Sequence, residues 1–207
     1  MTAERPSPDK DEIAALEPFE RLPLERIELV VTGAQAERAA REIASARALG
    51  FDTESKPTFA KGEVSDGPHI VQLATPERAW VFQLHEPACV EVLAALLAAP
   101  TPKVGFGLGD DLRRIRAKLG VEPAGVIDLN HVFRARGYRK DIGVKAAVAI
   151  VFGRRFAKSG RASTSNWAAR RLAESQLLYA ANDAWAAVRV FDALGPGALA
   201  PPVPSAP

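Results

Sequence analysis

The amino-acid sequence predicts a single α/β domain in which a mixed β-sheet is flanked by α-helices. The chain has 207 residues, enough for one sizeable hydrophobic core and few for two full domains. Along residues 26–194 the hydrophobic pattern alternates between the period of strands and that of helices. One pair of strands has a hairpin pattern and other strands are linked by helices, so the sheet should contain antiparallel and parallel pairs.

Short β-branched or apolar runs predict the strands. Ile27 to Val31 is β-branched, and the run from Ala48 to Thr53 is apolar until it ends in polar residues. Two further runs flank the turn sequence Thr75-Pro76-Glu77 and predict the hairpin. The predicted strands are residues 27–31, 48–53, 69–74, 79–84 and 103–106.

Helical spacing and stop signals predict the helices. Leu112, Ile115 and Leu119 form one apolar stripe, and Gly120 follows as a stop signal. Pro100 ends the preceding helix in the same way. The predicted helices are residues 34–47, 87–99, 111–119, 128–136, 143–152 and 174–194.

The two ends of the chain differ from its middle. Residues 1–12 are rich in Pro, Asp, Glu and Lys and predict a loose tail, followed by a short helix and an extended arm. Residues 196–207 contain too many prolines for a helix or a central strand. We therefore expect an N-terminal tail and arm over residues 1–25, a folded domain over 26–195 and a Pro-rich tail over 196–207.

The composition excludes several classes of protein. A hydrophobic fraction of 47% and a charged fraction of 25% are ordinary for a globular protein and exclude a wholly disordered chain. The net charge of +2 permits a polyanionic partner but does not require one. A single cysteine, Cys89, excludes an internal disulfide and a Cys-rich zinc site. No targeting or membrane-spanning segment is visible, so we expect a cytoplasmic protein with no membrane partner.

The first of three acidic motifs is Phe51-Asp52-Thr53-Glu54, at the end of a predicted buried strand. Residues two apart in a strand point to the same face, so Asp52 and Glu54 should project together. Two adjacent carboxylates repel each other unless a cation lies between them. The alternative is a strand that runs into a polar loop, with both acids solvated.

The second motif is Gly109-Asp110-Asp111-Leu112, where a short strand passes through glycines into a helix. Paired aspartates at a helix start could simply be an N-cap and first-turn acids that suit the helix dipole. The glycine spacing does not indicate a dinucleotide site, because acids after Gly109 would repel a pyrophosphate.

The third motif is Tyr179-Ala180-Ala181-Asn182-Asp183, inside the long last helix. Tyr179 and Asp183 are four residues apart and therefore share a face. An aspartate among core residues needs a partner such as a cation, an arginine or a helix N-terminus. The alternative is a surface aspartate, or one that pairs with Arg170 or Arg171.

Together these motifs predict a metal centre, provided that they converge in space. Asp52, Glu54, Asp111 and Asp183 form an all-oxygen ligand set, which Mg²⁺ and Mn²⁺ prefer. Two such ions about 4 Å apart are a known arrangement for in-line phosphoryl displacement. The Tyr179 hydroxyl could orient the attacking water by a hydrogen bond.

The order Asp-x-Glu, then Asp, then Tyr-x-x-x-Asp resembles the DEDD superfamily of 3′–5′ exonucleases in its tyrosine-containing branch. Within that branch the sequence resembles ribonuclease D and the exonuclease domain of the Werner syndrome protein. The resemblance covers residues 27–194. It also rests on the sequences around the acids: Leu49 to Glu54, Gly109 to Leu112, Lys158-Ser159, Ser165 to Trp167, and Gln176 to Ala184.

The resemblance implies an RNase H-like fold and makes residues 26–195 the exonuclease domain. It implies two divalent cations, Mg²⁺ or Mn²⁺, held by Asp52, Glu54, Asp111 and Asp183, with Tyr179 orienting the nucleophilic water. The implied activity is stepwise release of nucleoside 5′-monophosphates from the 3′ end of a single-stranded nucleic acid, RNA or DNA. We expect a monomer.

Two features depart from the family pattern. Many relatives carry an asparagine shortly before the second-motif aspartate, where this chain has Gly107-Leu108-Gly109. Its absence would weaken contact with the terminal nucleotide. Ala173 stands where a Thr or Ser usually starts the last helix, which should weaken the cap by about 1 kcal/mol. These departures leave a second hypothesis open, a nucleic-acid-binding module with weak or no turnover.

Basic residues before the third motif are candidates for contact with the substrate. Arg155, Lys158 and Arg161 belong to a locally basic stretch that could hold phosphates near the acids. Thr53 lies within the first motif, and Phe59, just after it, could wedge against the terminal base. The alternative for the basic stretch is a solvated charged surface.

Overall fold

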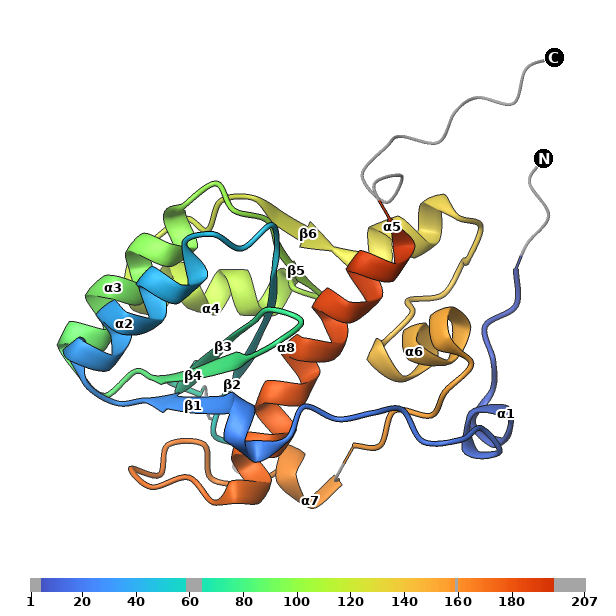
Figure 1. The fold of residues 1–207 in the computed structure, drawn as a ribbon, viewed down its shortest axis with the longest axis horizontal. Coiled ribbons are helices and arrows are strands. Elements are labelled where there is room, and N and C mark those ends of the chain that lie inside the picture. Colours follow the sequence, from blue (N-terminus) through green and yellow to red (C-terminus); the bar gives the residue numbers. More distant parts are fainter. Residues whose placement is uncertain (1–4, 59–64, 159, 196–207) are drawn as a thin grey trace, which may run out of the picture.

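A six-stranded mixed sheet forms the centre of the protein (Figure 1). The computed structural model describes residues 5–58, 65–158 and 160–195. The strand order is β1-β4-β3-β2-β5-β6. The strands are β1 (Ile27–Val30), β2 (Leu49–Glu54), β3 (Ile70–Ala74), β4 (Ala79–Gln83), β5 (Lys103–Gly105) and β6 (Val126–Asp128).

One strand of this sheet, β3, runs opposite to the other five. β3 is antiparallel to both β2 and β4, and Ala74 pairs with Ala79 at the hairpin end. The other pairs, β1 with β4, β2 with β5 and β5 with β6, are parallel. The predicted hairpin and the predicted mixed sheet are therefore confirmed.

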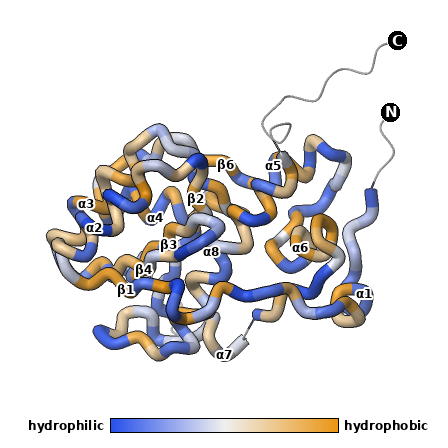
Figure 2. Tube along the Cα trace, in the orientation of Figure 1, coloured by the Kyte–Doolittle hydropathy of each residue, from blue (hydrophilic) through white to orange (hydrophobic). Residues whose placement is uncertain are grey.

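Helices cover both faces of the sheet. In β3, Ile70 and Ala74 face one hydrophobic core, and Val71 and Leu73 face the other. Strands β3 and β4, which both lie inside the sheet, are buried throughout, and Figure 2 shows them as mainly hydrophobic. One core contains α5 (Leu129–Ala135), α6 (Val144–Phe152) and α8 (Glu174–Leu194), and the other contains α2 (Gly33–Ile43), α3 (Pro87–Ala98) and α4 (Gly109–Leu119).

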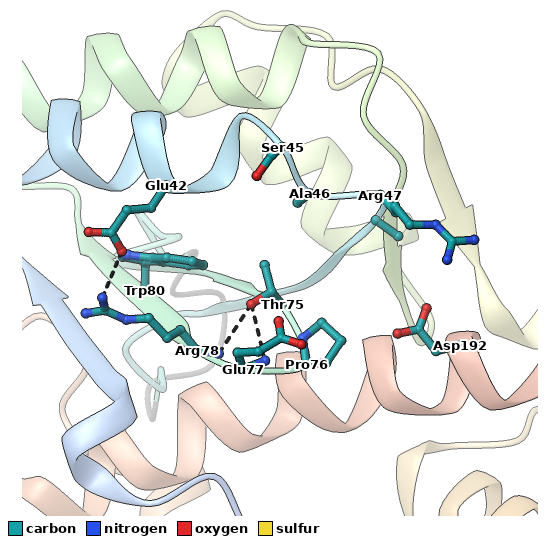
Figure 3. Close-up of a pocket in the computed structure, with 11 residues that line it drawn as sticks. Glu42, Ser45, Ala46, Arg47, Thr75, Pro76, Glu77, Arg78, Trp80 and Asp192 are labelled. Atoms are coloured by element: carbon teal, nitrogen blue, oxygen red, sulfur yellow. Dashed lines mark hydrogen bonds and ion pairs between the residues drawn. The ribbon is translucent and has the colours of Figure 1, made fainter.

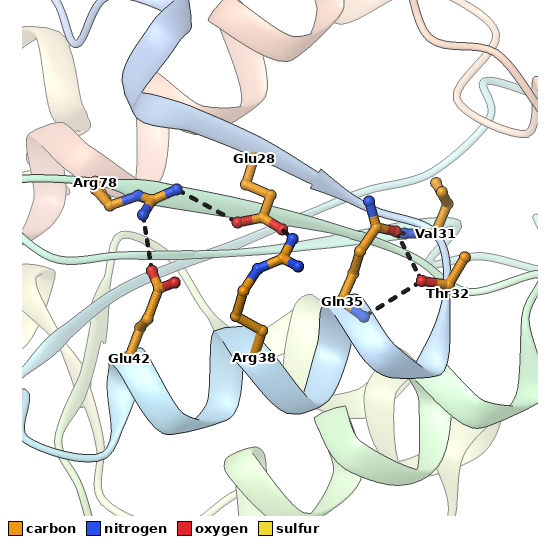
Figure 4. A network of polar contacts seen from close by, with 7 residues as sticks. All are labelled: Glu28, Val31, Thr32, Gln35, Arg38, Glu42 and Arg78. Atoms are coloured by element: carbon orange, nitrogen blue, oxygen red, sulfur yellow. Dashed lines mark hydrogen bonds and ion pairs between the residues drawn. The ribbon is translucent and has the colours of Figure 1, made fainter.

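Polar contacts fix the outer strand β1 against α2 and β4 (Figure 4). Glu28 on β1 forms ion pairs with Arg38 and with Arg78, the second at 3.3 Å. Arg78 also pairs with Glu42 on α2 at 2.9 Å. The side chain of Gln35 accepts the Val31 N–H at 2.9 Å. These contacts join three elements at the sheet edge farthest from β5 and β6.

The N-terminal segment is more ordered than the sequence predicts. A short helix, α1 (Lys10–Ala14), is capped by Asp9, whose carboxylate accepts two backbone N–H groups at 2.8 and 2.9 Å. Phe19 and Leu22 are 7% and 4% exposed and belong to the α8-side core. The expected loose tail over residues 1–12 is therefore wrong where α1 forms, and the packed core begins before residue 26.

Two short elements were not predicted, β6 and α7 (Gly160–Ser163), and a 3₁₀ turn spans Leu24–Arg26. α2 ends at Ile43, before the predicted residue 47. No helix in the described ranges has both the length and the apolarity that a bilayer crossing requires.

Candidate active site

Three of the predicted acids meet where β2 passes under α8. Asp52 and Glu54 share one face of β2, as strand alternation predicts, and Asp183 comes from α8. Carboxylate oxygens, one from each residue, lie within 4.8 Å of one another. Among the described residues this is the only such group of three or more metal-ligating side chains. Asp183 is 6% exposed and Asp52 and Glu54 are half-buried, so these acids are not simply solvated.

The fourth acid, Asp111, stands beside this group and is held through Thr53. The Thr53 hydroxyl donates a hydrogen bond to Oδ1 of Asp111, and the Thr53 N–H donates to Oδ1 of Asp52 at 2.9 Å. Asp111 is not within the three-acid group. Its neighbour Asp110 is exposed and pairs with Arg113 at 2.9 Å, which favours Asp111 as the site residue.

Asp128 fixes the loop that leads into Asp111. Its carboxylate accepts the Gly107 N–H at 3.1 Å and the Leu108 N–H at 3.0 Å, and it also caps α5 through the Asn130 N–H at 2.9 Å. The N-cap of α4 is Leu108, so neither aspartate of the second motif is the N-cap. Both lie in the first turn, where the helix dipole favours a negative charge.

Lys158 provides the cation that pairs with Asp183. Its Nζ lies 2.6 Å from Oδ2 of Asp183 and 5.2 Å from the centre of the Tyr179 ring. The alternative pairing with Arg170 or Arg171 is therefore wrong. Oδ1 of Asp183 is buried and has no hydrogen-bond partner among the described residues.

Tyr179 lies against the acids and is 8% exposed. Its ring packs against Trp167 with the ring centres 6.0 Å apart. Burial, the charge of Asp183 and that of Glu54 raise the pKa of Tyr179 to about 12, although Lys158 opposes the shift. The tyrosine is therefore a neutral hydroxyl at neutral pH.

Burial and mutual repulsion disfavour the charged form of the acids. Burial raises the pKa of Asp52 well above 3.8, and Asp183, Asp111 and Glu54 raise it further. The pKa of Glu54 rises to about 8, first through burial and then through Asp183. Burial also raises the pKa of Asp183 and of Asp111, against the opposing effects of Lys158 and of the Thr53 hydrogen bond, respectively.

This charge balance fits divalent cations. Burial lowers the pKa of Lys158, but the contact with Asp183 outweighs burial and the net shift is upward, so the ammonium stays protonated. One ammonium cannot balance four ionised carboxylates. Oxygen ligands suit Mg²⁺ and Mn²⁺, and the unpaired Oδ1 of Asp183 is available as one. A cavity of about 210 Å³ borders Asp52, Asp183 and Lys158.

Only some of the residues predicted to contact the substrate lie at the acid cluster. Lys158 is in the site, whereas Thr53 tethers Asp111. Arg155 is tied to the N-terminal arm, since its Nη1 donates to the Ala14 carbonyl at 3.1 Å. Phe59 and the side chain of Arg161 lie outside the described residues. Contact of any of these residues with a substrate stays a prediction.

Two buried polar residues near the site were missed by the sequence reasoning. Gln72 pairs with Asp52 across β2 and β3, is 0% exposed, and has no hydrogen-bond partner for either amide atom among the described residues. Asn182 binds the N-terminal arm: its Oδ1 accepts the Leu22 N–H at 2.8 Å and its Nδ2 donates to the Leu22 carbonyl at 3.2 Å. The sequence feature that could have identified Gln72 is a single amide residue inside an otherwise apolar predicted strand.

A larger cavity, of about 420 Å³, lies at the other end of the sheet (Figure 3). It is bordered by the end of α2, the β3–β4 turn and Asp192 on α8, with Trp80 as one wall. Ala48, which lines it, precedes β2, whereas Glu54 ends that strand. The larger cavity is therefore separate from the acids.

Comparison with known proteins identifies the family. Residues 27–197 match the family model described as 3′–5′ exonuclease. The chain belongs to this 3′–5′ exonuclease family. A curated 3′–5′ exonuclease of Arabidopsis thaliana is 27% identical over 149 residues, which are 70% of this chain and 52% of the relative. The chain thus spans about half the length of that exonuclease.

Solved structures of exonucleases share the fold. The EXO domain of Nibbler from Aedes aegypti has a TM-score of 0.70 at 23% identity, over 84% of this chain and 89% of that domain. Escherichia coli RNase D has a TM-score of 0.70 at 24% identity, over 81% of this chain and 44% of RNase D. The expected RNase H-like fold and the expected resemblance to 3′–5′ exonucleases are confirmed, and these similarities fit the tyrosine-containing branch.

Proposed function

We propose that the protein is a metal-dependent 3′–5′ exonuclease that hydrolyses single-stranded nucleic acid from its 3′ end and releases nucleoside 5′-monophosphates. The observation that carries the proposal is the convergence of Asp52, Glu54 and Asp183 within 4.8 Å, with Asp111 held beside them. Membership of the 3′–5′ exonuclease family supports the direction of cleavage.

The four acids would hold two divalent cations, Mg²⁺ or Mn²⁺. When bound, the cations would neutralise the phosphodiester charge and lower the pKa of the attacking water. Asp52 and Asp183, which both border the cavity of about 210 Å³, would position one side of the site. Asp111, oriented by Thr53, would complete the ligand set.

Tyr179 would orient the attacking water. Its hydroxyl stays protonated at neutral pH because its pKa is about 12, so it can both donate and accept a hydrogen bond. Packing against Trp167 restricts the ring, and the charges of Asp183 and Glu54 act on its hydroxyl, so Tyr179 would lie beside a phosphate bound at these acids. Tyr179 would therefore act by orientation rather than by proton transfer.

Single-stranded RNA is the first substrate to test. RNase D of Trypanosoma brucei has a structure in complex with RNA U12, which matches this chain with a TM-score of 0.72 at 22% identity over 90% of this chain and 65% of that one. That likeness shows the shared fold and supports the choice of RNA, with DNA as the comparison. Recognition of the 2′-hydroxyl would separate the two substrates.

The test is cleavage of 5′-labelled single-stranded RNA and DNA in Mg²⁺, Mn²⁺ or EDTA. We expect a ladder that shortens from the 3′ end, requires a divalent cation, and disappears in Asp183→Asn. The matched control is Asp110→Asn, which changes an exposed aspartate one residue from Asp111 and should keep the ladder. Binding of RNA without any ladder would contradict the proposal and support a binding module without turnover.

A further inference from the structure

The ammonium of Lys158 lies inside the acid cluster. It is 2.6 Å from Oδ2 of Asp183, a residue that is 6% exposed, and it stands over the ring of Tyr179. The charges of Asp183 and Asp52 both act on it. The ion pair therefore belongs to the same group of carboxylates that would hold the divalent cations.

Without a divalent cation, this ammonium has a clear electrostatic role. Asp183 is buried beside Asp52 and Glu54, and like charges in a buried site strongly disfavour ionisation. Removing one member of a buried ion pair leaves an uncompensated charge. Lys158 therefore supports the metal-free fold by balancing part of the negative charge.

A divalent cation on Asp183 would conflict with this contact. Mg²⁺ binds a carboxylate oxygen at about 2.1 Å, and Lys158 already lies 2.6 Å from Oδ2. Two cations on one small carboxylate repel each other strongly in a buried site. A cation on the unpaired Oδ1 would still stand close to the ammonium on Oδ2, so repulsion between the two charges favours withdrawal of the ammonium.

The local structure allows the side chain to move while its backbone stays in place. Lys158 is in neither a helix nor a strand, and its side chain is 27% exposed, so a path to solvent is open. Phe156, two residues earlier, is 3% exposed and anchors the segment in the core. A long lysine stem can swing between two positions from such an anchor.

We propose that Lys158 is a built-in counter-ion that occupies the metal site of the metal-free protein and leaves Asp183 when a divalent cation binds. Lys158 thus competes with the cation and sets the concentration at which the site fills. The proposal rests on the proposed function, because it takes Asp183 as a cation ligand.

Calorimetric titration of Mn²⁺ into the protein without nucleic acid tests the competition. Lys158→Met should lower the Kd for Mn²⁺ by about tenfold, because the competing charge is removed. The control is Lys145→Met, which removes an exposed lysine that acts on Asp183 only through its charge and should change the Kd less than about twofold. An unchanged or raised Kd in Lys158→Met overturns the counter-ion proposal. Absence of Mn²⁺ binding by the wild type overturns the proposed function instead.

A second measurement uses only the wild-type protein, so it does not depend on whether a variant folds. In ¹⁵N-lysine NMR spectra of the wild type, the Lys158 ammonium should have the signature of a buried ion pair in EDTA. Saturating Mg²⁺ should move this resonance to that of a solvated ammonium. A resonance that Mg²⁺ leaves in place overturns the proposal, because the ion pair would then survive cation binding.

Discussion

Gly50 on β2 touches Ala184 on α8 so closely that a Cβ built on Gly50 would stand 1.8 Å from the Ala184 carbonyl oxygen. Ala184 follows Asp183 directly, and Gly50 lies two residues before Asp52. The close approach of the two backbones thus fixes the distance between the strand acids and the helix acid. This close approach is possible because Gly50 has no side chain.

Gly50→Ala should therefore damage both the fold and the metal site. The added methyl group would clash with backbone atoms, which cannot rotate away as a side chain can, so α8 must shift. We expect a loss of about 2 kcal/mol or more in the free energy of unfolding. Urea denaturation measures this loss, and titration of Mn²⁺ should show weaker binding. Gly109→Ala is the matched control, because a Cβ there meets no atom within 4 Å. Equal stability of the two variants would contradict the close approach.

Asp128→Ala should disturb Asp111 at a distance. The substitution removes the acceptor of the Gly107 and Leu108 N–H groups and the cap of α5, at an expected cost of about 2 kcal/mol. Because this loop leads into α4, Mn²⁺ should also bind more weakly. Asp110→Ala removes an exposed acid and should alter stability by less than about 0.5 kcal/mol. Unchanged Mn²⁺ affinity in Asp128→Ala would show that Asp111 does not need this loop.

Asn182→Ala should lower stability without removing cleavage. Asn182 is 1% exposed and binds both backbone groups of Leu22, so its loss leaves buried polar groups unpaired, at a cost of about 2 kcal/mol. Thermal unfolding measures the change, with Asn166→Ala in an exposed turn as the control. Lost cleavage at unchanged stability would contradict this structural role and place Asn182 in the catalytic machinery.

The sequence predicts features that depend on neighbours in the chain. The hairpin follows from the turn at Thr75-Pro76-Glu77, and the shared face of Asp52 and Glu54 follows from strand alternation. The convergence of Asp183 with them depends on how α8 crosses β2, and the sequence indicated it only through resemblance to a family. A local sequence pattern cannot predict the contact between Asp52 and Asp183, which are 131 positions apart.

Other features escaped prediction for identifiable reasons. Lys158 lies in an irregular segment, and charge alone did not distinguish it from Arg170 or Arg171 as the partner of Asp183. β6 has three residues and leads directly into α5, and the helix predicted over residues 128–136 began on the last residue of this strand. The N-terminal arm packs because Asn182, 160 residues away from Leu22, satisfies its backbone.

Lys103 should make the stability of the protein depend on pH, separately from the carboxylates of the candidate active site. It is 0% exposed at the start of β5, and its Nζ donates to the carbonyls of Ala99 and of Ala124, the second at 3.1 Å. Burial lowers the pKa of this ammonium from 10.5 to about 8. Between these two values the unfolded chain holds a proton that the folded protein has lost, so stability contributed by this group rises with pH.

The comparison of wild type with Lys103→Met isolates this effect. Urea denaturation at several pH values from 7 to 10 should show the wild type gaining stability relative to the variant as pH rises above about 8, by up to about 3 kcal/mol in total. Below pH 8 both states of the wild type are protonated, so the difference between the two proteins should be constant. A difference that stays constant across the whole range would mean that Lys103 keeps its ordinary pKa, and that its two carbonyl partners fully replace the water lost on burial.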